Sequence, residues 1–325
     1  MLLKNNAFIS VAMTTYNGEK FVERQLASLY NQKRKPDEVI ICDDGSTDNT
    51  VEIIKRFVNS HNLCNWVVYI NNPNVGWKRN FYKAAGLTSG DIIFFADQDD
   101  IWCEEKIEMM SDLMIRHEMG CLYAEKQIID SDDNLFKERQ DKKVFTGNLF
   151  RIPLKNSFYE LTTLGCCMCV SRSLLKLYLE LNFPEGGHDS QCGRLAVLMS
   201  SLWHLDFPVI KYRIHNQNTS GISSIASYGQ SDKQTRIDDI SGSIMWIKRL
   251  LAKFNLDDMK YELLRNCLNF QCKRLDFLRG KSSFLFLVCN YKYYRDFTMF
   301  IGDLAYKYNL NKKLGLIRWY LNKLG

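Results

Sequence analysis

Three carboxylates crowd together in the stretch DIIFFADQDDIW (residues 91–102), where Asp97, Asp99 and Asp100 follow a run of apolar residues. Like charges so close repel one another, and each carboxylate prefers water to an apolar surface. A hard divalent cation resolves this conflict, because Mg²⁺ and Mn²⁺ prefer oxygen ligands and usually share them with substrate phosphates. The stretch therefore predicts that Asp97 and Asp99 hold Mn²⁺ or Mg²⁺ beside a diphosphate. A solvated acidic turn before the next helix is the alternative.

Two more polar clusters follow apolar runs earlier in the chain. The run FISVAM leads into TTYNG at residues 14–18, and EVIIC leads into DDGSTD at residues 43–48. In an open parallel sheet, ligands bind beyond the carboxyl ends of the strands. Three such clusters at one edge predict a shared ligand. The residues expected there are Thr14, Thr15, Tyr16, Asn17, Asp43, Asp44, Asp97 and Gln98.

Alternating strand-like and helix-like segments must position these clusters. Runs rich in β-branched and aromatic residues alternate with segments whose apolar residues recur at helical spacing. Such alternation predicts a mostly parallel α/β sheet with helices on both faces and right-handed crossovers. The predicted strands are 8–13, 38–42, 66–70 and 91–96, and the predicted helices are 19–30, 49–59, 78–87 and 104–117.

The pattern beyond residue 117 is less regular. Residues 118–165 are expected to be mostly irregular, and a domain boundary is placed at about residue 225. The result is an α/β domain over residues 1–225 and a helical region over residues 226–325. Further strands are expected at 166–170 and 209–214, and further helices from 171 and at 189–201, 235–254, 258–279 and 296–308.

Composition places the chain among globular, cytoplasmic proteins. The 325 residues are 46% hydrophobic and 25% charged, with only 5 prolines, which argues against extensive disorder. Eleven cysteines without a signal-peptide pattern argue for a reducing cytosol, and no apolar run has the ~18 residues that a membrane span needs. Cys166, Cys167 and Cys169 lack a partner pair at zinc spacing and are interpreted as part of a buried strand.

Positive charge is concentrated near the end of the chain. From Trp246 onward there are 16 Lys and Arg against 6 Asp and Glu, a balance of +10 in a chain whose net charge is +6. This basic, aromatic-rich region is either a solvated helical cap or a surface that adheres to an anionic membrane. The second interpretation would place the protein at the inner face of the plasma membrane as a peripheral protein. No motif for nucleic acid binding accompanies the charge, and a homo-oligomer is compatible with the sequence.

The three clusters and their spacing resemble the nucleotide-sugar domain of family 2 glycosyltransferases, which have the GT-A fold. The resemblance rests on VAMTTYNGEKFVERQLASLYNQ, EVIICDDGSTDNT and NVGWKRNFYKAAGLTSGDIIFFADQDD. It covers residues 7–117 closely and fades to short motifs up to about residue 220. DDGSTD followed by the DxD-type DQDD is a specific combination.

The resemblance implies roles for several of these residues. The segment with Thr14 and Tyr16 would line the nucleoside pocket, and Asp44 would pair with the edge of a pyrimidine. A carboxylate accepts the imide N–H of uracil or thymine, which agrees with that role. Arg79 would assist the nucleotide site. By the same resemblance, Asp97 lies near the ribose and Asp99 binds the metal.

The stretch FPEGGHD (residues 183–189) is the candidate source of a general base. Glycines let the backbone approach a ligand closely, and His188 and Asp189 follow them at the start of a predicted helix. The resemblance implies that an acid here acts as the base of a one-step inverting displacement, so Asp189 is preferred. His188 is the rival base, and an N-cap without catalytic function is the alternative for both.

The segment KYRIHN (residues 211–216) resembles the YRxH segment of the same family. There the histidine reaches the diphosphate or the metal, which assigns His215 and its neighbour Arg213 to the donor diphosphate, with His215 as a third metal ligand. A structural histidine is the alternative.

The resulting hypothesis is an inverting, metal-dependent transferase of one sugar from a nucleoside diphosphate sugar to a glycan or lipid-linked oligosaccharide in surface polysaccharide synthesis. Resemblance to bacterial rhamnosyltransferases favours dTDP-L-rhamnose as donor, with UDP-sugars next. Two alternatives stay open: a metal-dependent nucleotidyltransferase and a non-catalytic sugar-nucleotide binding module. The first usually carries a basic glycine-rich loop after the first strand, which TTYNGE is not.

Overall fold

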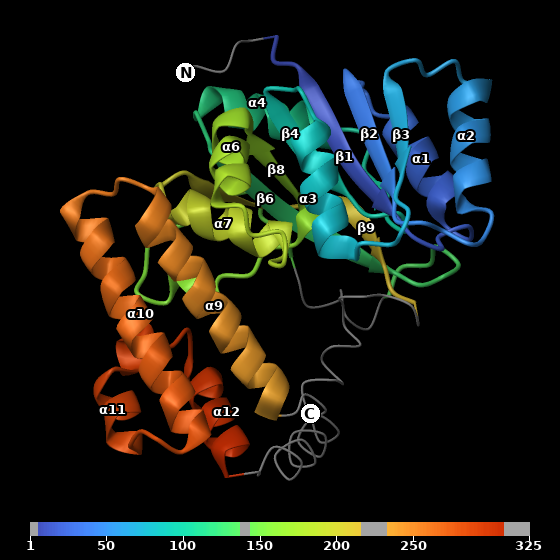
Figure 1. The fold of residues 1–325 in the computed structure, drawn as a ribbon. Coiled ribbons are helices and arrows are strands. Elements are labelled where there is room, and N and C mark those ends of the chain that lie inside the picture. Colours follow the sequence, from blue (N-terminus) through green and yellow to red (C-terminus); the bar gives the residue numbers. More distant parts are fainter. Residues whose placement is uncertain (1–5, 137–143, 216–232, 309–325) are drawn as a thin grey trace. The chain divides into compact units, whose positions relative to one another are not determined.

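A computed structural model describes residues 6–136, 144–215 and 233–308 of the chain (Figure 1). It divides the chain into two compact units. The first unit comprises Met1–Pro153 and Thr162–His215, and the second comprises Leu154–Leu161 and Asn216–Gly325. The predicted boundary at residue 225 lies outside the described residues. The assignment of Leu154–Leu161 to the helical unit was not expected from the sequence.

A nine-stranded sheet forms the first unit within the described ranges, in the order β3-β2-β1-β4-β8-β6-β9-β5, with β7 paired to β9. The strands β1 to β4 pair in parallel, and β6 pairs in parallel with β9. The pairs that involve β5, β7 and β8 are antiparallel. The strands are β1 (Ile9–Thr15), β2 (Glu38–Asp43), β3 (Trp66–Ile70), β4 (Ile92–Ala96), β5 (Ile101–Trp102), β6 (Cys121–Ile129), β7 (Leu149–Arg151), β8 (Met168–Ser171) and β9 (Leu202–Arg213).

Helices cover both faces of this sheet, as the parallel order requires. On one face, Val11 and Met13 of β1 belong to the same core as Leu26 of α1. On the other face, the ring of Phe95 in β4 lies 6.2 Å from that of Phe81 in α3. The mostly parallel α/β sheet with flanking helices is thus confirmed. The helices are α1 (Val22–Tyr30), α2 (Thr50–Ser60), α3 (Trp77–Leu87), α4 (Lys106–Arg116), α6 (Arg172–Leu181) and α7 (His188–Leu198).

The expectation of mostly irregular structure at residues 118–165 is wrong for Cys121–Ile129. These residues form β6, which lies between β8 and β9 in the sheet. The sequence CLYAEKQII hides this strand, because its polar residues are only half-buried and give no continuous apolar run. Strand β9 is also longer than predicted and begins at Leu202.

The second unit is helical, as predicted. Buried ionic groups hold it together: Arg274, 1% exposed at its side chain, pairs with the fully buried Asp303 and lies 2.6 Å from Glu160. Tyr294 also donates a hydrogen bond to Asp303 at 2.7 Å. The elements of the second unit are the short 3₁₀ helices η1 (Phe158–Glu160) and η3 (Tyr291–Tyr293) and the α-helices α9 (Lys233–Lys253), α10 (Asp258–Arg279), α11 (Phe284–Cys289) and α12 (Phe297–Lys307).

The described part of the chain contains no helix with both the length and the apolarity needed to cross a membrane.

Candidate active site at the carboxyl ends of the strands

Asp43 ends β2 and builds the DDGSTD turn. Its carboxylate is fully buried and accepts hydrogen bonds from the Thr15 hydroxyl at 2.6 Å and from the amide and hydroxyl of Ser46 at 2.8 and 2.6 Å. The amide of Gly45, whose φ of 78° suits glycine, donates a fourth at 3.1 Å. Four donors fill the capacity of a carboxylate. Asp43 therefore shapes the turn, although it was expected to face the ligand.

The carboxylate of Asp44 accepts hydrogen bonds from residues outside the DDGSTD turn. It is 2% exposed, and its carboxylate accepts hydrogen bonds from the amides of Val75 and Gly76 at 2.9 and 2.8 Å and from the Asn71 side chain at 2.8 Å. These donors come from the segment that leads into α3. Three donors leave one acceptor position of the carboxylate for a ligand N–H.

The TTYNG loop joins the other two clusters. The Gln98 side chain accepts from the amide of Tyr16 at 2.7 Å and donates to its carbonyl at 3.0 Å. The amide of Asn17 donates to the Ser46 hydroxyl at 2.9 Å. Tyr16 is 48% exposed, whereas Thr14 is buried. The three predicted clusters thus meet at one edge of the sheet, with the tyrosine ring open to solvent.

The predicted metal ligands Asp99 and His215 lie within hydrogen-bond distance of each other. The Nε2 atom of His215 lies 2.8 Å from Oδ2 of Asp99, and their side chains are 10% and 15% exposed. These residues are 116 positions apart, and the end of β9 brings them together. A carboxylate and an imidazole are a donor set that suits Mn²⁺, and the carboxylate alone suits Mg²⁺.

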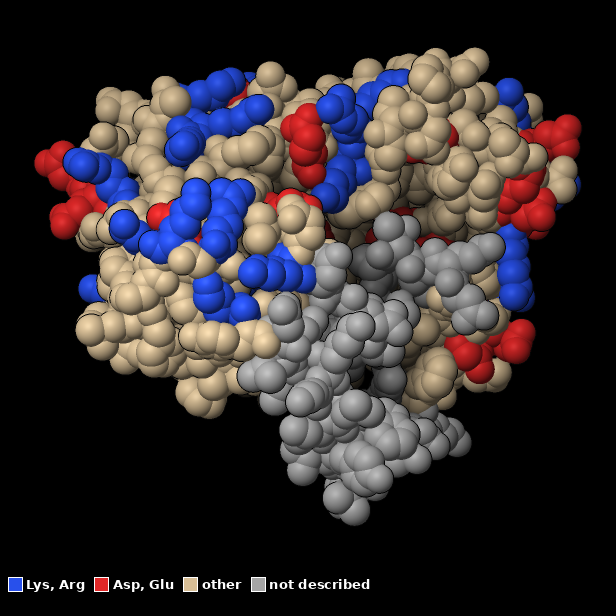
Figure 2. Space-filling model, turned by 60° about the horizontal axis from the view of Figure 1, so that its bottom comes forward, with Lys and Arg blue, Asp and Glu red and all other residues tan. Residues whose placement is uncertain are grey.

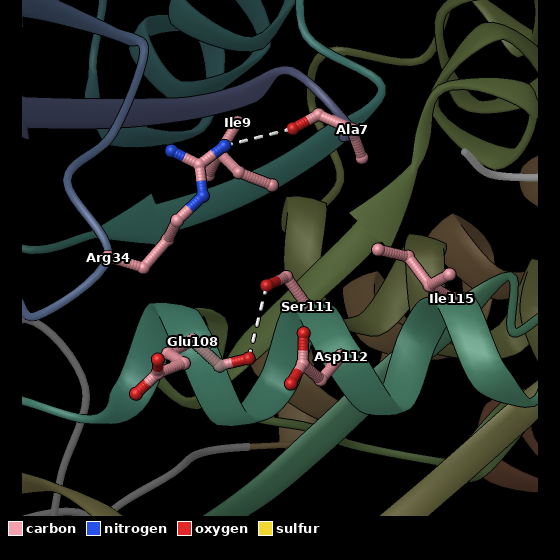
Figure 3. Close-up of a pocket in the computed structure, with 7 residues that line it drawn as sticks. All are labelled: Ala7, Ile9, Arg34, Glu108, Ser111, Asp112 and Ile115. Atoms are coloured by element: carbon pink, nitrogen blue, oxygen red, sulfur yellow. Dashed lines mark hydrogen bonds between the residues drawn. The ribbon is translucent and has the colours of Figure 1, made fainter. Parts of the chain in front are cut away.

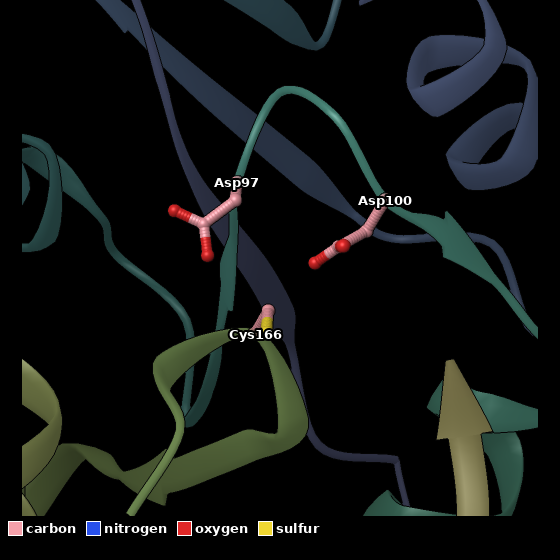
Figure 4. A group of neighbouring side chains, drawn as sticks. All are labelled: Asp97, Asp100 and Cys166. Carbon is pink, nitrogen blue, oxygen red and sulfur yellow. The ribbon is translucent and has the colours of Figure 1, made fainter. Parts of the chain in front are cut away.

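Asp97 and Asp100 lie beside this pair. One ligand atom each of Asp97, Asp100 and Cys166 lies within 4.8 Å of the others (Figure 4). Oδ1 of Asp100 accepts from the Arg213 amide at 3.1 Å, and its buried Oδ2 meets no nitrogen or oxygen donor among the described residues. Burial and the charge of Asp99 hold the pKa of Asp97 well above its usual range and raise that of Asp100 to about 7. A divalent cation would relieve this surplus of negative charge.

A buried lysine contacts Cys166, which lies beside Asp97 and Asp100 in the acidic cluster. Lys106 is fully buried, and its Nζ donates to the Cys166 carbonyl at 2.5 Å and lies 3.3 Å from the centre of the Trp102 ring. Burial lowers its pKa to about 8, against the opposing charges nearby, which include Asp100. No sequence pattern indicates this buried cation, because a lysine at the start of a helix is usually solvated.

Arg213 supports the DQDD loop from within. It is fully buried, and its guanidinium donates to the carbonyls of Asp99 at 2.8 Å and Asp130 at 2.9 Å and pairs with Asp133 at 2.5 Å. We expected it to face the donor diphosphate. The structure instead turns it inward, where it links the loop to the turn after β6.

Asp189 lies in the first turn of α7, partly exposed. Its Oδ1 accepts from the amide of Ser190 at 2.6 Å, and its carbonyl accepts from the Thr163 hydroxyl at 2.8 Å. A Cβ on Gly187 would approach Oδ1 to 2.7 Å, so the glycine leaves room for this carboxylate. The charge of Asp189 contributes to the raised pKa of Asp97, which places the predicted base close to the acidic cluster.

His188 points the other way, into the core. It is 3% exposed, and its ring centre lies 4.0 Å from that of Phe81 and 4.5 Å from that of Phe95. Burial lowers its pKa to about 4, and neither ring nitrogen has a hydrogen-bond partner in the described part of the structure. The rival base is therefore buried between α3 and β4, where it packs on Phe81 and Phe95.

Arg79, the predicted nucleotide-site arginine, lies on α3. Its guanidinium lies 2.7 Å from the carboxylate of Glu185, with side chains 56% and 49% exposed. This pair connects α3 to the FPEGGHD loop. The exposure leaves the arginine accessible to a ligand phosphate.

A separate pocket lies at the opposite edge of the sheet (Figure 3). It opens near Ile9, where β1 begins, and Arg34 donates there to the Ala7 carbonyl at 3.0 Å. Because the polar clusters follow the other end of β1, this pocket is not part of the candidate site. Its remaining lining residues are Glu108, Ser111, Asp112 and Ile115.

Comparison with known proteins gives a family match over more than half of the chain. The model of the family described as Glycosyl transferase family 2 matches residues 10–179. This range contains all three polar clusters and ends before the candidate base.

Two relatives align with about two thirds of the chain. A protein of Shigella flexneri named dTDP-rhamnosyl transferase RfbG is 31% identical over 233 residues, which cover 66% of this chain and 76% of the relative. The Escherichia coli protein UDP-Glc:alpha-D-GlcNAc-diphosphoundecaprenol beta-1,3-glucosyltransferase WfgD is 28% identical over 219 residues, 65% of this chain and 79% of its own.

Solved structures share the fold. TarS 1-349 of S. aureus, in complex with UDP-GlcNAc, superposes with a TM-score of 0.58 at 19% identity, covering 92% of this chain and 80% of that one. The mannosyltransferase PcManGT of Pyrobaculum calidifontis, in complex with GDP-Man and Mn²⁺, gives 0.54 at 15% identity, covering 96% and 87%. At these identities the likeness shows a common fold.

Proposed function

The chain belongs to glycosyl transferase family 2, and from this premise we propose that it moves one sugar from a nucleoside diphosphate sugar to an acceptor hydroxyl, with inversion and with help from Mn²⁺ or Mg²⁺. The observation that carries the proposal is the Asp99–His215 pair, 2.8 Å apart, beside the raised-pKa carboxyl of Asp97 and within electrostatic reach of Asp189. The residues that we propose as metal ligands and as base therefore lie in the same part of the first unit.

Asp99, His215 and Asp97 would hold the cation, which when bound supplies positive charge to the leaving diphosphate. These three residues fit a divalent cation, because the buried carboxylates have more negative charge than the described side chains neutralise. Arg213 binds the backbone carbonyl of Asp99, so the carboxylate of Asp99 stays available to the metal. Arg213 is thus a positioning residue in this proposal.

Asp44 would recognise the base of the nucleotide. Its one remaining acceptor position suits the imide N–H of uracil or thymine, and its carboxylate is already fixed by the amides of Val75 and Gly76. The exposed ring of Tyr16 is available to pack against the nucleoside.

Asp189 would act as the general base. Its carboxylate takes the proton from the acceptor hydroxyl while that oxygen forms a bond to the anomeric carbon of the donor. The bond from the same carbon to the diphosphate oxygen breaks, and the electron pair leaves with the nucleoside diphosphate. Attack opposite the leaving group in one step inverts the anomeric configuration.

We assign dTDP-L-rhamnose as the favoured donor and a UDP-sugar as the next choice. The name of the Shigella flexneri relative supports the first, and that of the Escherichia coli relative supports the second. Both nucleotides carry the imide N–H that Asp44 would accept. The second name includes a sugar linked to diphosphoundecaprenol and so supports a lipid-linked acceptor. With such an acceptor, we propose that the protein is peripheral on an anionic cytoplasmic membrane surface.

Replacement of the base tests this function. We expect Asp189→Asn to lower the release of dTDP or UDP by about 100-fold or more, the usual contribution of general base catalysis. The affinity for the donor, measured by calorimetry with Mn²⁺, should stay within about twofold, since Asp189 does not hold the nucleotide. The control is Glu180→Gln, an exposed carboxylate on α6. Wild-type release by Asp189→Asn would overturn the assignment of the base.

A further inference from the structure

The second unit exposes an unusual number of large apolar side chains within one short stretch. In α11 only Leu287 is buried, whereas Phe284, Leu285 and Val288 are 42%, 68% and 44% exposed. Tyr291 and Phe297, which follow, are 41% and 62% exposed. Isolated exposed apolar residues are ordinary, but a concentration of them on one surface marks an interaction site.

Ring contacts show that the three aromatic side chains of this stretch form one surface. The rings of Phe284, Tyr291 and Phe297 lie 5.8, 5.7 and 6.1 Å from the ring of Phe300, which is 8% exposed. Three exposed aromatic rings therefore surround one buried ring. Val288 lies one helical turn beyond Phe284 on the same side of α11. We call Phe284, Leu285, Val288, Tyr291 and Phe297 the apolar patch.

Cations border this patch. Residues 281–298 contain Lys281, Lys292 and Arg295 against one acid, Asp296, which pairs with Arg295 at 2.8 Å. Lys292, next to Tyr291 of the patch, is exposed. Figure 2 shows several groups of Lys and Arg side chains on the face that it draws.

Lys292 also lines a pocket of about 390 Å³ within the second unit. Two more lysines, Lys155 and Lys260, line it with a single carboxylate, Glu262. Lys260 is paired with Asp257 at 2.9 Å, but the described residues place no carboxylate within ion-pair distance of Lys155 or Lys292. A phosphate group in this pocket would meet two lysines whose charge is not already neutralised.

We propose that the apolar patch inserts into the interface of an anionic lipid bilayer while Lys155 and Lys292 bind lipid phosphate. This inference deepens the proposed function, on which its biological purpose rests, since a lipid-linked acceptor is presented at such a surface. Aromatic and aliphatic side chains next to cations are the combination that binds peripheral proteins to anionic membranes. Helix α11 has six residues and can only lie in the interface.

Charge distinguishes a bilayer from a protein partner. A protein interface of this kind loses charged residues toward its apolar centre but needs no net positive border. Here the border is cationic, and each lysine near an anionic leaflet strengthens binding by about fivefold. The anionic bilayer is therefore the occupant that the charges favour.

The test is sedimentation of the full-length chain with lipid vesicles, without donor or acceptor. We expect binding to vesicles with one third phosphatidylglycerol and much weaker binding to pure phosphatidylcholine. Leu285→Ser with Phe297→Ser should lower the partition coefficient by about 10-fold or more, as burial of two partly exposed apolar side chains implies. Lys155→Glu with Lys292→Glu should remove the preference for phosphatidylglycerol.

The matched control is Met245→Ser, because Met245 on α9 is 48% exposed and lies outside the apolar patch. It should bind vesicles like the wild type, and all variants should keep the wild-type melting temperature. Equal binding by wild type and Leu285→Ser/Phe297→Ser would overturn the proposal. So would a wild type that ignores vesicles but forms a concentration-dependent dimer that the same double variant abolishes, because the patch would then be a protein interface.

The vesicle assay and the transfer reaction can fail separately. Sugar transfer to a soluble acceptor depends on Asp99 and Asp189, which lie in the first unit, and vesicle binding does not. Loss of vesicle binding with intact transfer would overturn only the membrane proposal. Intact vesicle binding without any transfer would overturn only the proposed function.

Discussion

The polar residues at the edge of the sheet divide into those that build the site and those that remain available to a ligand. The carboxylate of Asp43 accepts hydrogen bonds from four donors within the protein. The guanidinium of Arg213 binds the DQDD loop and Asp133. Asp44 keeps one acceptor position, and Asp99 points at His215. Residues of the same type in one motif therefore have different roles, and substitution should separate them.

Asp99→Asn and Asp43→Asn are a matched pair for this distinction. We expect Asp99→Asn to raise the Mn²⁺ concentration needed for half-maximal activity by at least about 10- to 100-fold, with a nearly unchanged melting temperature. Asp43→Asn should instead destabilise the fold by about 2 kcal/mol, because it weakens charge-assisted hydrogen bonds in a buried turn. Metal titration and denaturant unfolding of both variants measure the two effects. The same loss of stability in both would contradict the division.

His188 makes stability depend on pH. Its pKa is about 4 in the folded chain because of burial, and an unfolded histidine has a pKa of about 6.5. At a pH between these two pKa values, His188 is protonated in the unfolded chain and neutral in the folded chain. The free energy of unfolding therefore falls by about 2 kcal/mol from pH 7 to pH 4.5 because of this histidine.

His188→Phe removes this contribution and keeps an aromatic ring between Phe81 and Phe95. We expect the free energy of unfolding to fall less from pH 7 to pH 4.5 in the variant than in the wild type. Urea unfolding at both pH values gives the difference. An equal fall in the two proteins would show that His188 does not titrate in this range.

At the scale of elements, sequence patterns were most reliable where strands and helices alternate. The segments from β1 to α4 have clean apolar periods, and their predicted and observed bounds differ by few residues, except that the two-residue strand β5 was not predicted. Strand β6 was missed because the half-buried polar residues 125–127 interrupt its apolar ones, and α11 because its exposed apolar residues show no amphipathic period. Both depend on what packs against them, which a local pattern does not contain.

The candidate site was predictable in its residues but not in their orientations. The motifs located Asp99, Asp189 and His215, because carboxylates and a histidine at strand and helix ends are visible in sequence. The inward turn of Arg213 and the burial of Lys106 depend on partners from distant elements, such as Asp133 and Cys166. No spacing rule predicts such partners.

Arg213 connects the end of β9 to the DQDD loop, and Arg213→Lys should show its positioning role. A lysine keeps the charge but cannot bind two carbonyls and a carboxylate with a rigid fork. We expect a moderate loss of stability together with a rise of about 10-fold in the Mn²⁺ requirement, since Asp99 loses its backbone anchor. A purely structural arginine would lower the melting temperature and leave the metal requirement unchanged.

At the scale of the whole molecule, the described residues form two units with separate cores. The first contains the candidate active site, and the second depends on the buried Arg274, Asp303 and Glu160. Units with separate cores often unfold in separate steps. We therefore expect calorimetry of the full-length chain to show two transitions.

Asp303→Asn should lower only the transition of the second unit. Loss of one partner of a buried ion pair costs about 3–5 kcal/mol, because Arg274 is left without its counter-charge. A nucleoside diphosphate with Mn²⁺ at about 100 times its Kd should stabilise only the first unit, by about 2.7 kcal/mol. A single transition that responds equally to the substitution and to the ligand would contradict two independent units.

The central claim is that the acidic edge of the sheet holds a divalent cation which serves a departing nucleoside diphosphate. Its most direct test is the release of UDP or dTDP from a panel of nucleotide sugars with Mn²⁺ or Mg²⁺, before and after a chelator is added. We predict that release is abolished by the chelator and restored by added metal, and that Asp99→Asn needs at least about 10-fold more metal than the wild type for the same restoration. Full release in the presence of the chelator would contradict the claim.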